Sequence, residues 1–460
     1  MASGADSTPR AAARYTLLAV TVLGTMSNNV VNVPLRSIAE DFDEPLSAAV
    51  LCVSAFVLAL AIAMPVTGWL GDRIGQKRTL ILSLVLMVVA QALAAAAPNL
   101  TVLVALRGVQ GFACSAIPPM IMGLLGAFYP TRRLEVMGAW AAANGVGQAV
   151  GPPVGGLVSD AFGWRAIFVL IALLSVAVLV ASWLLVPAVP HRRSPLDVRG
   201  AVLLTAGVGL VLVAVTTVSQ RASLVVAGLE IAAGLVLLLG YGLVSRGRAT
   251  AMIPLPVLVE TRFLRSAAAA FGQMFCLGAA LVALPLFFTG PLDLSVAVAG
   301  VLFFALPAVM AVAAPVVSRA SRSHGPRPVL RIGLLTLLVG NVVTGVLTTV
   351  GSGTATAVAV TVVLLVLGTG MACVQTPAAA GATRSPAGAY GAAVGLYSMI
   401  RFSGSGIAAA WVALVYPTGQ MLLLFGGCSV VALLALTASF LGPDPQPMVT
   451  SELTRTSGLG

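Results

Sequence analysis

The sequence predicts an all-α membrane protein with fourteen membrane-spanning helices, and three observations support this fold class. The 460-residue chain is 59% hydrophobic and 8% charged, whereas a soluble domain carries about 25% charged residues. Its apolar runs are each close to the roughly 20 residues that cross the hydrocarbon core as a helix. The basic residues gather in alternate connections. These features together exclude a water-soluble globular fold.

The apolar runs place the predicted helices in order along the chain. They cover residues 15–35, 47–69, 79–97, 101–128, 135–158, 164–187, 199–218, 222–244, 264–289, 294–317, 329–350, 355–377, 389–415 and 419–442. Of the 25 Lys and Arg residues, only Arg36, Arg165 and Arg221 fall on the far side from the N-terminus. The positive-inside rule therefore places both termini in the cytoplasm. The net charge of +11 thus reflects topology, and we expect no nucleic-acid partner.

A charged turn joins the second and third predicted helices, with the sequence Gly68-Trp69-Leu70-Gly71-Asp72-Arg73-Ile74-Gly75-Gln76-Lys77-Arg78. An ordinary cytoplasmic loop would explain its bases but not its acid or its glycines. The pattern of Gly68, Leu70, Asp72, Arg73, Gly75 and the Lys77-Arg78 pair resembles the signature loop of the major facilitator superfamily of secondary transporters. The resemblance implies a major facilitator fold. It also implies a gating role, in which Asp72 pairs with a basic group and a helix end of the other half.

A faint internal repeat agrees with the two similar halves of such transporters. Pro65 precedes Gly75 at the same spacing by which Pro315 precedes Gly325, and both pairs end the second helix of a half. Arg322 stands where the first copy has Asp72. The repeat leaves residues 199–244 as an added helical hairpin between the halves.

The resulting 6 + 2 + 6 layout resembles the fourteen-spanner branch of the drug:proton antiporter family. We expect a cytoplasmic tail at 1–14, a six-helix half at 15–187, and linkers with the hairpin at 188–248. A second six-helix half at 249–442 and a cytoplasmic tail at 443–460 complete the chain.

The fourth predicted helix carries Arg107 and, three residues later on the same face, Gln110. An arginine at the centre of a spanning helix costs about 2.5–3.5 kcal/mol on insertion scales, so it needs a cavity or a partner. The alternative is an arginine that extends to the interface. The pair resembles a family motif, which implies that Arg107 faces the central cavity and takes part in proton coupling.

The fifth predicted helix carries a stripe of glycines and a Pro-Pro pair, between Asn144 and Gly156. Small residues every four positions allow close helix contact. The pattern of Gly147, Gly151, Pro152, Gly155 and Gly156 resembles a motif associated with antiporters. We expect these glycines to shape a bend, and Asn144 and Gln148 to line the substrate pathway.

The first predicted helix departs from the fourteen-spanner pattern, because Ser27 stands in the place of the usual acid. Asn28 and Asn32 are expected on one face as hydrogen-bonding lining. The missing carboxylate removes the usual proton-coupling residue. Glu230 is the one acid well inside an apolar run, and it has either a proton role or a structural role in the hairpin. In the second half, the polar lining candidates are Gln273, Asn341, Gln375, Tyr397 and Arg401.

The sequence has no phosphate-binding loop and no metal-spaced His/Cys cluster, so we expect no cofactor, no metal and no enzymatic chemistry. The leading interpretation is a monomeric exporter of a small lipophilic compound, a drug or antibiotic, in the cell membrane of a bacterium. The proton gradient would supply its energy, and its partners would be substrate, protons and lipid. An importer or uniporter of a small metabolite is the alternative within the fold. A membrane enzyme or sensor is the third interpretation, but it predicts soluble domains that the sequence lacks.

Overall fold

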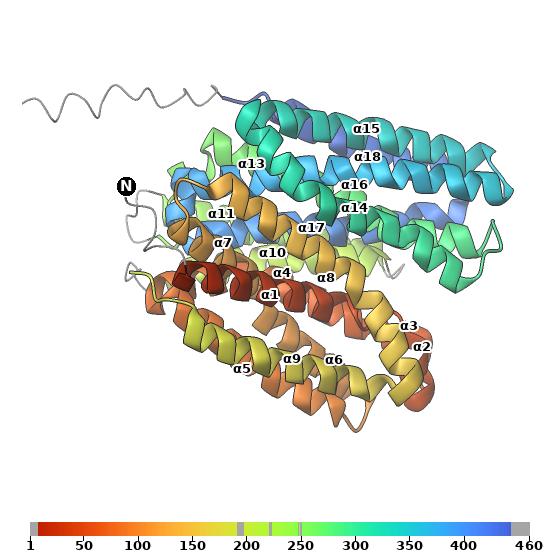
Figure 1. The fold of residues 1–460 in the computed structure, drawn as a ribbon, viewed down its shortest axis with the longest axis horizontal. Helices are drawn as coiled ribbons and strands as arrows, with labels where there is room; N and C mark the ends of the chain where they lie inside the picture. The colour runs from red at the N-terminus through yellow and green to blue at the C-terminus, as the bar shows by residue number, and fades with distance from the viewer. Residues whose placement is uncertain (1–7, 191–196, 220–222, 247, 249–250, 443–460) are drawn as a thin grey trace, which may run out of the picture.

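The computed structural model describes residues 8–190, 197–219, 223–246, 248 and 251–442. Within these ranges every regular element is a helix (Figure 1). The predicted tail at 443–460 and the start of the N-terminal tail lie outside the described residues, as does most of the basic linker after Val189.

The first bundle contains six long helical segments, of which the fourth is split in two. These are α1 (Thr8–Asn29), α4 (Leu51–Ile74), α5 (Gln76–Ala95), α6 with α7 (Leu100–Ser115, Ile117–Phe128), α8 (Arg133–Phe162) and α9 (Trp164–Leu185). The short α2 (Leu35–Asp41) and α3 (Leu46–Ala49) lie between α1 and α4. The split between α6 and α7 precedes Pro118 and Pro119, which lack the N–H needed to continue a helical ladder.

The first helix differs from its predicted range of 15–35, because it begins at Thr8 and ends at Asn29. Residues 30–34 form a turn that ends at Pro34, and a proline disfavours helical angles in the residue before it. Asn32 therefore lies beyond the helix, where it is exposed. The expectation that Asn28 and Asn32 share one helix face is wrong.

The second bundle repeats the pattern with six long helices. These are α13 (Thr261–Thr289), α14 (Val296–Ser323), α15 (Pro326–Val350), α16 (Gly353–Arg384), α17 (Gly391–Val415) and α18 (Met421–Ala438). The short α12 (Leu255–Leu258), η1 (Pro386–Ala389) and η2 (Tyr416–Thr418) join or precede them. Gly75, between α4 and α5, has φ 99°, and Gly325, between α14 and α15, has φ 87°. The two glycines of the repeat thus make the same kind of turn, which favours glycine.

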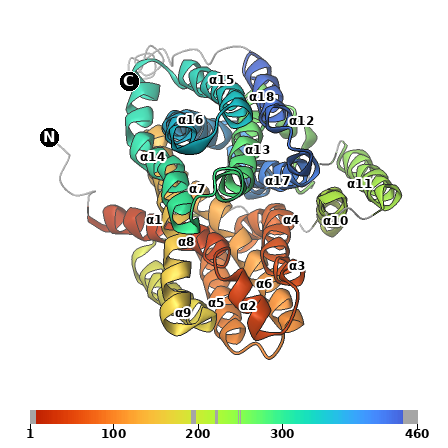
Figure 2. The ribbon, with the colours of Figure 1, turned by 90° about the vertical axis from the view of Figure 1, so that its right-hand side faces the viewer.

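The added hairpin lies outside the two bundles. It consists of α10 (Val198–Ser219) and α11 (Leu224–Ser245), which pack against each other. Figure 2 shows α10 next to the bundles and α11 farther out. Helix α10 contacts α4 of the first bundle and α17 of the second, so the hairpin covers one side of the seam between them.

Twelve helices in the described part of the chain are long and apolar enough to cross a membrane, judged by length and composition. They include both helices of the hairpin. Two further long helices, α1 and α8, are not among these twelve, and both carry charged residues (Arg14; Arg133, Glu135 and Asp160). The count of fourteen spans therefore stays a prediction.

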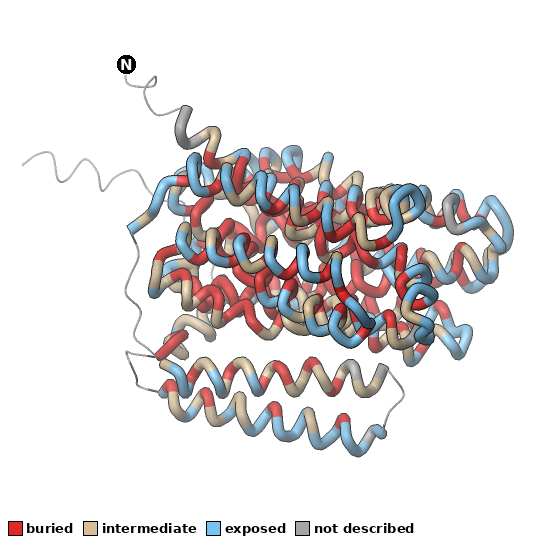
Figure 3. Tube along the Cα trace, turned by 90° about the horizontal axis from the view of Figure 1, so that it is seen from below, coloured by how far each residue is buried: buried red, intermediate tan, exposed pale blue. Residues whose placement is uncertain are grey.

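The two bundles meet chiefly along two helix pairs, α4 with α17 and α8 with α14, and α7 and α8 also contact α17 and α16. Buried residues concentrate in the interior of the molecule, as Figure 3 shows. The seam between the bundles is the place to look for a substrate site, because the binding sites of such two-halved transporters lie at the repeat interface.

Candidate functional site

A small cavity lies between the bundles, with a volume of about 30 Å³. The first bundle supplies most of its lining, including Thr25 and Asn28 of α1, and Trp140 and Asn144 of α8. The second bundle supplies Phe402 of α17. We refer to this space as the central cavity. It holds about one water molecule, so the seam is closed around it in this conformation.

Arg401 lies beside the central cavity and is 1% exposed. Its guanidinium carbon is 5.1 Å from the ring centre of Trp140 and 5.0 Å from that of Phe402, and both rings line the cavity. None of its three side-chain nitrogens has a hydrogen-bond partner within the described residues. Arg401 is therefore a buried cation whose contacts are two aromatic faces, one from each bundle.

Other buried polar side chains of the second bundle also lack hydrogen-bond partners. Within the described residues, the amide groups of Gln273 and Gln375 and the hydroxyl of Tyr397 have no hydrogen-bond partner. Gln273 and Tyr397 are 0% exposed and Gln375 is 1% exposed. They come from α13, α16 and α17, and α13 packs against the other two. We refer to Gln273, Gln375, Tyr397 and Arg401 as the polar cluster.

Buried polar groups in proteins are as a rule hydrogen-bonded, and each exception needs an explanation. These four exceptions, together with the hydroxyls of Thr376 and Ser398 on the same helices, are costly to stability. A polar ligand that reached these groups would satisfy them.

The asparagines of the central cavity differ in how they are held. The Asn144 amide donates to the Trp140 carbonyl at 2.9 Å, and its oxygen accepts from Thr25 Oγ1 at 3.3 Å. The Asn28 oxygen is buried without a partner among the described residues. Gln148 is half-buried and is not among the lining residues of the central cavity. Asn341 is fully enclosed on α15, where its amide donates to the Leu337 carbonyl.

Arg107 is 0% exposed, so it does not extend to the interface. Its Nη1 donates to Gln110 Oε1 at 2.8 Å and to the Ser27 carbonyl at 3.4 Å, and its Nε donates to the Cys52 carbonyl at 3.1 Å. The guanidinium also lies 4.3 Å from the ring centre of Phe56. Arg107 thus joins α1, α4 and α6 inside the first bundle, and it is not among the lining residues of the central cavity.

Ser27, at the place of the family's usual acid, is fully buried. Its hydroxyl accepts a hydrogen bond of 2.9 Å from Gln91 Nε2 of α5. Gln110 of α6 donates to the carbonyl of Ala90, which precedes Gln91 on α5. The region around Ser27 and Arg107 is therefore a neutral hydrogen-bond network with a single cation.

The charged turn brings Asp72 to the start of α17 in the other bundle. The N–H of Gly391 donates to both Asp72 oxygens, at 2.8 and 2.7 Å, and the N–H of Ala392 donates at 3.3 Å. A carboxylate is favourable at a helix N-terminus because the unpaired N–H groups and the helix dipole attract negative charge. A Cβ on Gly68 would lie 2.1 Å from the Gly391 carbonyl oxygen, so the two backbones cross closely.

The other charges of the turn have contacts within the first bundle. Arg73 lies over the ring of Trp69, at 5.6 Å from its centre. Lys77 Nζ donates to the Trp183 carbonyl of α9 at 2.8 Å. Arg78 is exposed.

A second contact between the bundles uses the other copy of the repeat. Arg322, at the end of α14, lies 3.4 Å from a Glu135 oxygen in the first turn of α8. Glu135 also pairs with Arg14 at 3.2 Å and with Arg132 at 2.7 Å. The repeat position that carries an acid in the first bundle thus carries a base in the second, and each meets a group of opposite polarity.

The glycine stripe of α8 packs against α1. A Cβ on Gly155 would lie 2.0 Å from the Val30 carbonyl oxygen, and one on Gly147 would lie 2.6 Å from that of Val22. Gly151 faces Met26 and Asn29, and Gly156 faces Val33. Helix α8 runs without interruption through Pro152 and Pro153. The described contacts give these glycines a role in close helix packing.

Glu230 lies on α11 of the hairpin and accepts a hydrogen bond of 2.9 Å from Thr217 of α10. It is half-buried, and it is not among the lining residues of the central cavity.

The sequence profile described as Major Facilitator Superfamily matches residues 16–409 and 266–455. The chain is 31% identical over 192 residues to the multidrug export protein EmrB of Haemophilus influenzae, covering 41% of this chain and 38% of the relative. It is 28% identical to the drug efflux pump JefA of Mycobacterium tuberculosis, covering 68% and 62%. For the tetracenomycin C resistance and export protein of Streptomyces glaucescens, the identity is 30% and the coverage 44% and 40%. The aligned segments thus span less than two thirds of these relatives.

Two solved structures share the fold. The human organic anion transporter MFSD10 (TETRAN) superposes with a TM-score of 0.70 and 17% identity, over 94% of this chain and 100% of that chain. The proton:xylose symporter XylE superposes with a TM-score of 0.65 and 14% identity, over 93% and 95%. With the twelve candidate spans, these findings indicate a multi-pass protein of the cell membrane. The chain belongs to the major facilitator superfamily of transporters.

Proposed function

We propose that the protein is a secondary active exporter of a small lipophilic compound, a drug or antibiotic, in exchange for protons. The export and resistance proteins among its relatives support this proposal. In the proposed topology, fourteen spans form two six-helix halves and a hairpin, and both termini lie in the cytoplasm. A single chain would form the transporter and would need no cofactor, because the proton gradient supplies the energy.

The unpaired guanidinium of Arg401 is the observation that carries the proposed substrate class. A buried charge demands a compensating partner, and the polar cluster offers further unpaired groups on three helices that pack together. Among the described core helices, Arg107 and Arg401 are the buried mid-helix charges, and Glu230 lies on the hairpin. The site therefore favours an anionic or a neutral polar substrate over a lipophilic cation.

Alternating access would proceed by rocking of the two bundles about the central cavity. The contacts of Asp72 with Gly391 and of Arg322 with Glu135 join the bundles at the end that holds the predicted cytoplasmic loops. Transport would require both contacts to open, so that the polar cluster becomes accessible to the cytoplasm. Trp140 and Arg401 would separate in the same motion, because they belong to opposite bundles.

The alternative function is uptake or facilitated diffusion of a small metabolite. The burial of Ser27 and its hydrogen bond from Gln91 favour it, since the usual proton-carrying acid is replaced by a neutral pair. The relatives favour export.

Dye efflux from cells that express the protein tests the proposal. Fluorescein, an anion, and rhodamine 6G, a cation on the same ring system, serve as matched probes. We expect the protein to lower the accumulation of fluorescein much more than that of rhodamine 6G, and a protonophore to abolish this effect. Efflux that persists with the protonophore would support the uniporter. Strong ethidium export that Glu230→Gln abolishes would overturn the proposed substrate class.

A further inference from the structure

A larger pocket opens at the end of the bundles that holds the predicted cytoplasmic loops. Its volume is about 710 Å³, and its walls come from the start of α8 and from α13, α15 and α16. It is separate from the central cavity, with which it shares no lining residue. Both bundles contribute, because Pro130, Thr131 and Arg133 belong to the first and the remaining lining residues to the second.

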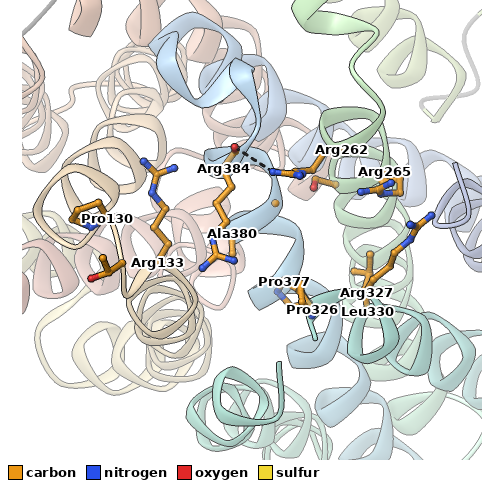
Figure 4. Close-up of a pocket in the computed structure, with 13 residues that line it drawn as sticks. Pro130, Arg133, Arg262, Arg265, Pro326, Arg327, Leu330, Pro377, Ala380 and Arg384 are labelled. Carbon is orange, nitrogen blue, oxygen red and sulfur yellow. Dashed lines mark hydrogen bonds between the residues drawn. The ribbon is translucent and has the colours of Figure 1, made fainter. Parts of the chain in front are cut away.

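Arginine dominates the charge of this pocket. Its lining includes Arg133, Arg262, Arg265, Arg327 and Arg384, and among the described residues it contains no aspartate or glutamate. Figure 4 shows these side chains gathered around one space. They belong to α8, α13, α15 and α16. Pro326, Leu330 and Pro377 add apolar wall between them. We refer to this space as the arginine pocket.

Some of the N–H donors of these arginines already bond to backbone carbonyls of the protein. Arg133 donates to the Thr383 carbonyl and Arg262 to the Arg384 carbonyl, at the end of α16. Arg265 and Arg327 donate to the Leu441 carbonyl after α18. These three carbonyl oxygens are neutral acceptors. Within the described residues, no side-chain hydrogen bond or ion pair of Arg384 is seen.

These carbonyl contacts explain why single arginines lie here, but not why five share one space. Each guanidinium carries five N–H donors in a planar fork that matches an oxyanion. Like charges at close range repel, and within the described residues the lining offers no carboxylate beside Arg133, Arg262 and Arg384 to relieve the repulsion. Partial burial also lowers the pKa of the Arg133 guanidinium from its ordinary value, which reflects the cost of holding the cation there. A bound anion would remove this cost.

We propose that the arginine pocket is an oxyanion-binding site that takes a phosphate, sulfonate or carboxylate group carried on a partly apolar molecule. Its volume lies in the range of about 300–1,000 Å³ that is usual for small-molecule sites. Arginine forks bind such groups through paired charge-assisted hydrogen bonds. The site would join α8 of the first bundle to α13, α15 and α16 of the second through one ligand. The inference does not depend on the direction or the coupling of transport.

Inorganic pyrophosphate is a suitable probe, with the purified full-length protein in a neutral detergent. We expect pyrophosphate, but not chloride at equal ionic strength, to raise the unfolding temperature. Direct titration should show binding at least tenfold weaker in the double variant Arg262→Gln, Arg384→Gln. The matched control Arg246→Gln, Arg319→Gln removes two exposed arginines outside the pocket and should bind like the wild type.

A third variant guards against loss of folding as the explanation. Arg262→Lys, Arg384→Lys keeps both charges and loses the planar forks, so its affinity should fall between the wild type and the Gln variant. Equal pyrophosphate binding by the wild type and the Gln variant would overturn the proposal. So would equal losses in the Gln variant and the control.

The lipid composition of the membrane distinguishes a lipid headgroup from a soluble anion as the occupant of the pocket. Nanodiscs of phosphatidylcholine alone are compared with nanodiscs that also contain phosphatidylglycerol. If an inner-leaflet headgroup fills the pocket, phosphatidylglycerol should suppress pyrophosphate binding to the wild type. If the natural ligand is a soluble organic anion, pyrophosphate binding should persist in both and fluorescein should compete with it. Either result supports the oxyanion site and assigns its occupant.

Discussion

Arg107 and Arg401 are both arginines buried within a long helix, one in each bundle, and their surroundings differ. Arg107 donates to Gln110 and to two backbone carbonyls, and it packs on Phe56. Arg401 is enclosed to the same degree but has aromatic faces in place of hydrogen-bond acceptors. The comparison teaches that burial alone does not mark a substrate site. The first arginine holds three helices of its own bundle together, whereas the second keeps its donors available at the seam.

The largest expected effect is that of Arg401→Met. The change keeps much of the side-chain length and removes the charge, so the site loses its partner for an anion. We expect efflux of an anionic substrate to fall at least a hundredfold, which corresponds to a free-energy change of about 2.7 kcal/mol. The protein should still reach the membrane. Efflux assays with fluorescein, normalised to the amount of protein in the membrane, measure this. Undiminished efflux would mean that Arg401 does not contact the substrate.

Arg107→Lys should come next. Lysine keeps the charge but cannot reproduce the fork that reaches Gln110, Ser27 and Cys52 together. Breaking such a buried network costs about 3–5 kcal/mol, so we expect a lower unfolding temperature and little transport. Robust efflux by a stable Arg107→Lys protein would show that the network is dispensable, and the contrast with Arg401 would weaken.

Asp72→Asn should have a smaller effect, without loss of expression. A carboxylate at a helix N-terminus contributes about 0.3–2 kcal/mol, so the variant should shift the balance between conformations and lower transport several-fold. Turnover in proteoliposomes measures this. Wild-type turnover in purified Asp72→Asn protein would contradict the role of Asp72 as a latch between the bundles.

Arg322→Gln should have the smallest effect. Arg322 is about half exposed and shares Glu135 with Arg14 and Arg132, and exposed ion pairs contribute about 0.2–1 kcal/mol. We expect transport to change less than twofold, and the difference from the wild type to shrink further in high salt. An effect larger than that of Asp72→Asn would reverse the order of the two latches.

The sequence predicts the family, the paired bundles and the hairpin, because apolar length and the charged turn are local signals. Arg107 with Gln110 also follows from local spacing, and the structure places the two side chains in contact. The N–H donors at the start of α17 do not follow, since Asp72 and Gly391 meet only through the packing of two distant helices.

The aromatic part of the central cavity is harder to predict than its polar part. Trp140 and Phe402 look like ordinary core residues, and only the seam between the bundles brings them to Arg401. The five arginines of the arginine pocket each resemble a topology signal, since the positive-inside rule accounts for any one of them. Asn32 looks like a lining residue in the sequence but is not one. Its spacing from Asn28 suggests a shared helix face, whereas the turn before Pro34 places Asn32 beyond the end of the helix.

The most direct test of the account compares the unfolding of two matched variants, Arg107→Met and Arg401→Met, in the same detergent without substrate. Replacing a hydrogen-bonded buried cation should destabilise the protein, whereas replacing an uncompensated one with an apolar side chain should leave it equally or more stable, by up to about 4 kcal/mol. We therefore predict a lower unfolding temperature for Arg107→Met and an equal or higher one for Arg401→Met, which nevertheless fails to transport. A large loss of stability in Arg401→Met would contradict the account, because Arg401 would then be a structural residue like Arg107.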